Sequence, residues 1–275
     1  MSYSAVMTHV QADDAGAPRL ACAIDIAQRF HAALIGVAAE MIPPLAFDGG
    51  YFSVEAEWQV AMRQQIEDRL KAAKKAFHAA TAGLGARASF ECGVQLPEPA
   101  VAAASRAADL IVAGGAPRGR SDPYMSCAPA QLAISSGRPV LVAPPDAPPL
   151  LAKNILLAWK DTREARRALT DATPFFEQAE RVVVAGICPE AEAENVRIEV
   201  DDVAGALRRR GVKAEAKVIH DPHPDGFQIL RQASLAGADL IVCGAYGHSR
   251  LGEWVFGGVT ADLLAQDQTY LLFSH

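Results

Sequence analysis

The sequence predicts an α/β fold built from two tandem halves, each a five-stranded parallel sheet sandwiched by helices. Short β-rich runs alternate with longer helical patterns along the whole chain, which is typical of parallel βαβ units. The run AADLIVAG at 107–114 also returns at 237–244 as GADLIVCG, an offset of 130 residues. Such internal similarity indicates that one ancestral unit was duplicated.

The predicted elements follow the same order in both halves. In the first half we expect helices at 15–30, 54–82, 97–107 and about 126–136, between strands at 4–10, 33–39, 86–92, 109–113 and 139–143. In the second half we expect helices at 163–178, 193–210, 225–236 and 258–266, between strands at 153–159, 181–187, 212–219, 239–243 and 269–273. An insertion at 40–53, in the first half only, is either a lid or a packed surface loop.

A proline-rich run, APPDAPP at 143–149, separates the halves. Its four prolines can continue neither a helix nor a central strand. We therefore expect one domain at 1–145 and another at 150–275. So short a linker favours an intramolecular pseudo-dimer of the two halves, by analogy with symmetric dimers, and a homodimer of the whole chain is also open.

Composition excludes several classes of protein. With 51% hydrophobic and 21% charged residues among 275, the chain is neither disordered, collagenous nor a disulfide scaffold. A net charge of −6 argues against a nucleic-acid partner. No run of about 18 uncharged apolar residues predicts a membrane span. The start of the chain lacks the pattern of a secretory signal, and five widely spaced cysteines indicate reduced core thiols, so we expect a cytoplasmic protein.

The stretch GAYGHSRLGEWVFGGVT at 244–260 directly follows a predicted strand. Ligands of open parallel sheets bind at the carboxyl ends of strands. Gly244 and Gly247 allow backbone amides to turn inward, and Gly257 and Gly258 begin a helix whose N-terminal amides favour an anion. We expect a phosphate cradle here. The alternative is that the glycines only close a tight connection between strand and helix.

In this spacing the chain resembles the tandem universal stress proteins, over nearly its whole length. The resemblance implies flavodoxin-like or Rossmann-like domains and, in an ATP-binding subgroup, the loop G-x2-G-x9-G-[ST]-x-[ST]. Gly244, Gly247 and Gly257 match its three glycines. In the remaining positions Gly258 stands where Ser or Thr is usual, Val259 follows it, and Thr260 matches the last hydroxyl.

The resemblance also bears on residues outside the glycine loop. The family's nucleotide binders have V-D-x-S at the end of the first strand, whereas this chain has AWKDT, which places Lys160 at the aspartate position. Lys160 could meet phosphates and Asp161 could shift in, but Asp161 or Thr162 is equally an N-cap for the next helix. The resemblance also places Ala158 and Ile187 against the adenine. His248 either contacts the phosphates or lies at their rim.

The first half departs from the nucleotide-binding pattern. At the offset of 130 residues, Pro117, Cys127 and Ala130 replace Gly247, Gly257 and Thr260. Because proline has no amide to donate, we expect a degenerate, structural copy. The run GGAPRGRS at 114–121 fits a P-loop apart from its arginine, but Asp-Pro follows where a helix must begin, so we expect no P-loop.

Two other sequence patterns concern metal binding and catalysis. His220 and His223 form a His-x-x-His pair that could bind a transition metal or be an ordinary loop, and we expect no metal site. No nucleophile motif such as G-x-S-x-G is present, so we expect no dedicated catalysis.

The sequence thus predicts a stress-response regulator that binds ATP, with or without Mg²⁺, in its C-terminal half and acts on an unknown protein partner. A scaffold that has lost nucleotide binding and a slow ATPase are the alternatives.

Overall fold

The computed structural model describes residues 2–11, 16–44, 52–115, 122–146, 148–220, 223, 225–245 and 258–275. The chain divides into two compact units. One is formed by residues 4–136, and the other by residues 137–275 together with the N-terminal residues up to Tyr3. We call them the N-terminal and the C-terminal unit. Most of the insertion predicted at 40–53 lies outside the described residues.

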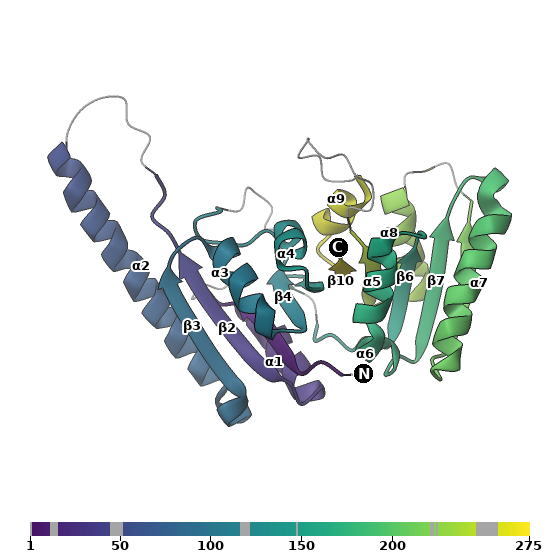
Figure 1. Cartoon of the computed structure of the whole chain (residues 1–275), viewed down its shortest axis with the longest axis horizontal. Coiled ribbons are helices and arrows are strands. Elements are labelled where there is room, and N and C mark those ends of the chain that lie inside the picture. The colour runs from purple at the N-terminus through teal and green to yellow at the C-terminus, as the bar shows by residue number, and fades with distance from the viewer. Residues whose placement is uncertain are drawn as a thin grey trace. The chain divides into compact units, whose positions relative to one another are not determined.

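The N-terminal unit is a parallel sheet with helices (Figure 1). Its strand order is β3-β2-β1-β4, from β1 (Ala5–His9), β2 (Ala33–Glu40), β3 (Ala88–Val94) and β4 (Leu110–Gly114). Its helices are α1 (Gly16–Arg29), α2 (Phe52–Ala80), α3 (Pro97–Ala104) and α4 (Pro129–Ser136), with short 3₁₀ turns η1 (Ala82–Arg87) and η2 (Ser105–Ala107). Helix α2 packs closely on the sheet at Gly36, where an added Cβ would lie 2.5 Å from the Phe77 ring.

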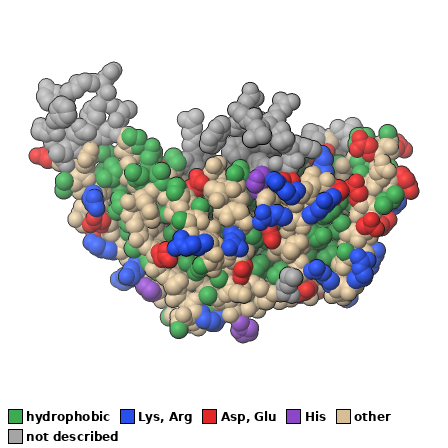
Figure 2. Space-filling view, viewed as in Figure 1, with side chains coloured by type: hydrophobic (Ala, Val, Ile, Leu, Met, Phe, Trp, Pro, Cys, Tyr) green, Lys and Arg blue, Asp and Glu red, His purple; other side chains and the backbone are tan. Residues whose placement is uncertain are grey.

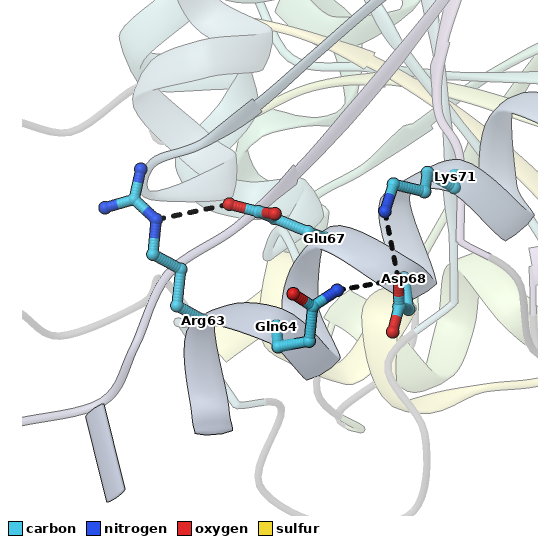
Figure 3. Close-up of polar contacts among 5 residues, drawn as sticks. All are labelled: Arg63, Gln64, Glu67, Asp68 and Lys71. Atoms are coloured by element: carbon cyan, nitrogen blue, oxygen red, sulfur yellow. Dashed lines mark hydrogen bonds and ion pairs between the residues drawn. The ribbon is translucent and has the colours of Figure 1, made fainter. Parts of the chain in front are cut away.

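The long helix α2 lies beside the edge strand β3 (Figure 1). It turns one apolar stripe inward, formed by Ile66, Leu70, Ala73 and Phe77. On its outer side Arg63 pairs with Glu67, and Asp68 accepts hydrogen bonds from Lys71 and Gln64, which lower the pKa of Asp68 (Figure 3). Within the described ranges, no helix is both long and apolar enough to cross a bilayer.

The C-terminal unit contains a parallel sheet in the order β10-β9-β6-β7-β8. Its strands are β6 (Asn154–Trp159), β7 (Arg181–Ile187), β8 (Ala214–Ile219), β9 (Leu240–Gly244) and β10 (Tyr270–Ser274). A further strand, β5 (Val140–Ala143), belongs to the same unit and runs antiparallel beside β10. The strand predicted last in the first half therefore pairs with the last strand of the second half.

Helices cover both faces of this second sheet (Figure 1). They are α5 (Arg163–Asp171), α6 (Thr173–Phe176), α7 (Ala193–Arg209), α8 (Asp225–Ala236) and α9 (Gly258–Ala265), with a 3₁₀ turn η3 (Glu190–Glu192). The single helix predicted at 163–178 is wrong, because the chain breaks between α5 and α6. Pro174 explains the break, since its ring clashes with the carbonyl four residues earlier and it has no amide to donate. The predicted ends of the other helices and strands are confirmed to within three residues.

The faces can be assigned from close contacts. A Cβ on Gly186 would lie 2.4 Å from Val196 of α7, and one on Gly244 would lie 2.5 Å from the backbone of α5. Lys217 pairs in register with Ala185, the residue before Gly186. Its ammonium group donates a hydrogen bond to Gln232 of α8 (2.7 Å). Because side chains alternate along a strand, α5 and α7 lie on one face and α8 on the other.

All five cysteines are free thiols. Cys22, Cys188 and Cys243 are buried, as expected for core residues. Cys92 is exposed on the edge strand β3, so the prediction of core thiols is wrong there. No residue of β3 is fully buried, so this strand lies at the margin of the core.

Candidate functional site

The order of the strands reverses around β6, with β7 on one side and β9 on the other. Ala158, near the end of β6, pairs in register with Cys243, near the end of β9. Ligands of open α/β sheets bind in the crevice beyond such a reversal. The two predicted site segments, one after β6 and one after β9, therefore begin side by side.

The residues expected against adenine share one face of the sheet. Ala158 pairs with Ala185 on β7, and Ile187 lies two residues farther along that strand, so both point toward α8. Ala158 is buried and Ile187 is half-buried. Cys243 lies beside Ala158 on the same face, and burial raises the pKa of its thiol to about 12. Together they form an apolar, unreactive surface at the strand ends.

The residues after β6 have distinct roles. Lys160 is exposed and, within the described part of the chain, takes part in no ion pair. The carboxylate of Asp161 accepts two hydrogen bonds from the guanidinium of Arg166, at 2.9 and 2.7 Å. The Thr162 hydroxyl accepts a hydrogen bond from the Ala165 amide (3.2 Å), which confirms the N-cap interpretation for Thr162 rather than for Asp161.

Positive charge accumulates around the start of α5. This helix carries Arg163, Arg166 and Arg167, and Figure 2 shows Lys and Arg side chains gathered over it. Glu164 is the buried exception. Burial raises the pKa of its carboxyl, but hydrogen bonds from its own amide and from Arg163 outweigh burial and hold that pKa below its usual value. The outer surface next to Lys160 is therefore mostly cationic.

Gly244 is explained by packing. An added Cβ would lie 2.5 Å from the amide nitrogen of Ala165 and 2.7 Å from the carbonyl carbon of Glu164. The next amide, of Ala245, donates to the carbonyl of Ser274 in the sheet (2.9 Å). Gly244 thus lets α5 approach the sheet. The other predicted cradle residues, Gly247, His248 and Gly257, lie outside the described residues.

The start of α9 is open. Gly258 is exposed, and among the described residues no atom lies within 4 Å of the place where its Cβ would be. Val259 is half-buried and Thr260 is buried in the same turn. The first amides of a helix have no partner within it. No described residue would clash with a Ser or Thr at position 258.

Sequence reasoning missed a contact between Cys188 and His220. These residues follow β7 and β8, whose last residues are in register, and the Sγ atom lies 3.9 Å from Nδ1. Burial, Glu192 and Glu199 raise the pKa of the Cys188 thiol, so it is not an activated nucleophile. The sequence could have indicated this contact, because Cys188 and His220 each directly follow one of two adjacent strands. Among the residues described, no three potential metal ligands gather at one point.

Two buried polar side chains were also missed. Among the described residues, neither amide atom of Gln228 in α8 has a hydrogen-bond partner, although the residue is completely buried. The indole N–H of Trp159, at the end of β6, is also buried and has no partner in this part of the chain. The helical periodicity of α8 places Gln228 on the side that faces the core. A polar residue at such a position could have indicated a buried amide from the sequence alone.

The equivalent strand ends of the N-terminal unit are filled by its own side chains. Val6 pairs with Leu110 as Ile155 pairs with Leu240, so His9 corresponds to Ala158. The His9 ring contacts the Ala39 carbonyl (3.3 Å).

Arg19 also contacts the end of β1. Its guanidinium donates to the His9 carbonyl (2.8 Å) and to the Gln11 side chain (2.9 Å), and Gln11 donates to the Met125 carbonyl (2.9 Å). Burial raises the pKa of the nearby Cys127 thiol to about 12. These contacts lie at the end of β1 and in the residues that follow it.

Comparison with known proteins agrees with this architecture. Residues 152–266 match the model of the universal stress protein family. The C-terminal half of the chain belongs to the universal stress protein family. The resemblance found in the sequence is thereby confirmed. Among curated proteins, none matches this chain by sequence.

The full chain also resembles solved structures. A universal stress protein from Archaeoglobus fulgidus is similar over 98% of this chain and 94% of its own, with 15% identity and a TM-score of 0.72. A protein of unknown function from Pseudomonas aeruginosa PAO1 has 15% identity and a TM-score of 0.59, over 98% of this chain and 92% of its own. At such identities these likenesses show the fold alone, and they show it for both halves, which confirms the tandem α/β prediction.

Proposed function

We propose that the C-terminal universal stress protein domain binds ATP at the carboxyl ends of β6, β7 and β9, and that binding regulates a cytoplasmic stress response. The observation that carries the proposal is the paired ends of β6 and β9. They bring the apolar surface of Ala158 and Ile187 next to the exposed Lys160 at a reversal of strand order. Such a junction can hold a flat base on one side and phosphates on the other.

Each part of the nucleotide has a candidate partner. The base would lie against Ala158 and Ile187, and the phosphates would meet the ammonium group of Lys160. The open first turn of α9 at Gly258 offers backbone amides and the positive end of a helix to the same phosphates. Binding would shift the population of conformations at the strand ends, and a protein partner would recognise the favoured one.

The described side chains do not fit a magnesium ion well. Mg²⁺ prefers carboxylate oxygens, but Lys160 stands where the family has aspartate, and Asp161 is held by Arg166. We therefore expect ATP binding to depend on Lys160 more than on Mg²⁺.

A scaffold without nucleotide binding is the second candidate. The ion pair between Asp161 and Arg166 favours it, because it removes the nearest carboxylate from any metal or ribose. In that case the domain would act through its surface alone.

The first test is direct. We would denature freshly purified protein, separate released small molecules by anion exchange, and titrate nucleotide-free protein with ATP by calorimetry, with and without Mg²⁺. ATP or ADP near one per chain, or binding heat in the titration, supports the proposal. Neither released nucleotide nor heat at millimolar ATP contradicts it and favours the scaffold.

Two variants locate the site. Lys160→Ala should weaken ATP binding roughly 10- to 100-fold, the usual effect of losing one charge-assisted hydrogen bond. Lys153→Ala is the matched control, because Lys153 is exposed at the opposite end of β6 and pairs with Glu180 (2.7 Å), so affinity should not change. Gly258→Ser, which restores a hydroxyl in open space, should strengthen binding. Equal losses in both lysine variants would contradict the assigned phosphate position.

A further inference from the structure

Gln228 of α8 is completely buried, yet no described residue forms a hydrogen bond with the oxygen or the nitrogen of its carboxamide. We propose that Gln228 is the residue that selects adenine over guanine in the nucleotide site. This inference rests on the proposed function, and it adds the recognition of the base, which no other described residue supplies.

An unpaired buried amide is costly for a protein. Folding removes the amide from water, and native structures leave few such groups without a partner. A leucine or methionine at this inward position of α8 would avoid that cost. Burial removes both the N–H donor and the carbonyl acceptor of Gln228 from water. The fold therefore leaves a complete hydrogen-bonding group without a described partner.

The position of Gln228 places it near the base. Helix α8 packs against β6 and β7, the strands that carry Ala158 and Ile187, and on their face of the sheet. Gln232, one turn later in α8, accepts a hydrogen bond from Lys217, which is level with Ala185 in the sheet. Because α8 starts at the carboxyl ends of the strands, Gln228 lies one turn closer to those ends than Gln232.

The chemistry of a carboxamide fits adenine. Its oxygen accepts and its nitrogen donates, and adenine presents a donor at N6 beside an acceptor at N7. Guanine presents two acceptors at the same edge, so the oxygen of Gln228 would face another acceptor. The apolar surface of Ala158 and Ile187 is indifferent to this distinction. The carboxamide is therefore the group that separates the two bases.

Access to Gln228 requires a local change. The side chain has no exposed surface in the ligand-free protein. A base can reach it only after the side chain or the first turn of α8 shifts. Association should therefore be slower than for a preformed site.

The test measures ATP and GTP affinity by calorimetry for the wild-type chain and for Gln228→Met, which keeps the volume and removes both polar atoms. The wild type should prefer ATP. In the variant ATP affinity should fall roughly 5- to 150-fold, the value of one bidentate base contact, and the preference over GTP should shrink by the same factor. Without ligand, the variant should unfold about 2 to 4 °C higher, because an orphaned polar group is gone.

Gln232→Met is the matched control. It makes the same substitution one turn away, at an amide that already pairs with Lys217, and should leave the preference for ATP unchanged.

The outcomes separate the two proposals. If the wild type binds ATP and GTP equally, or Gln228→Met keeps the wild-type preference, the inference is overturned while ATP binding itself stands. If the ligand-free variant unfolds at a lower temperature, the amide is satisfied by water and the inference is overturned. If the wild type binds no nucleotide, the proposed function fails and the inference fails with it.

Discussion

Each half of the chain ends its fourth strand with a glycine, and the two glycines face different neighbours. Beside Gly114, an added Cβ would lie 3.0 Å from the terminal nitrogen of the Arg19 side chain. Beside Gly244, it would lie 2.5 Å from the backbone nitrogen of Ala165. A flexible side chain can move away, whereas the backbone of a capped helix cannot.

The strand ends differ in the same way. In the N-terminal unit His9 stands where the C-terminal unit has Ala158, and its ring contacts the Ala39 carbonyl (3.3 Å). Arg19 lies over the same strand end. In the C-terminal unit the corresponding face remains apolar and Lys160 points to solvent. The two halves thus share the strands and the glycine, while the residues at the end of the first strand differ.

The largest expected effect is the response of the N-terminal unit to acid. Burial and the charge of Arg19 lower the pKa of His9 to about 3. The unfolded chain takes up a proton below about pH 6.5 and the folded chain does not, so this contribution to stability is complete above pH 6.5 and is lost as the pH falls toward 3. We expect a loss of roughly 2 kcal/mol at pH 5 and roughly 3 kcal/mol at pH 4.

The measurement compares urea unfolding of the wild type and of His9→Ala at pH 7, 5 and 4. The variant copies the residue of the other half and should show a shallower dependence on pH. Identical slopes would mean that the His9 ring takes up its proton as readily in the folded chain as in the unfolded chain, so that its pKa is not lowered.

A smaller effect is expected from the two glycines. Gly244→Ala should lower the free energy of unfolding by about 1–3 kcal/mol, because its methyl group overlaps the backbone of α5. Gly114→Ala should change it by less than about 0.5 kcal/mol, since the Arg19 side chain can move. Urea unfolding of both variants checks the comparison, and equal losses would show that the two sites are equally rigid.

The smallest expected effect concerns the N-cap of α5, the helix whose backbone packs against Gly244. Thr162→Ala removes the acceptor for the Ala165 amide and should cost about 1 kcal/mol of stability. Thr170→Ala, within the same helix, removes only an exposed hydroxyl that donates to the Arg166 carbonyl and should be nearly neutral. Thermal unfolding of the two variants would reveal whether the cap matters, and a neutral Thr162→Ala would argue that α5 is held by packing alone.

Much of the site could be expected from the sequence. Ala158, Lys160 and Ile187 lie at strand ends as predicted, because the strands carry clear apolar runs with sharp boundaries. The packing of Gly244 against Ala165 could not be derived, since a glycine in a loop motif looks the same whether it faces a phosphate or a helix. The His9 ring and the orphaned amide of Gln228 also depend on contacts between residues far apart in the chain.

By itself the sequence determined the alternation of strands and helices, the duplication and the place of the glycine loop, because these follow from local hydrophobic periodicity and from repetition. Only the tertiary structure decided that β5 runs antiparallel beside β10, that Gly244 serves helix packing, and that His9 fills one site while Ala158 leaves the other apolar. The physical reason is that these contacts join residues 30 or more positions apart, and the local sequence pattern does not specify which distant side chain will lie beside a given residue.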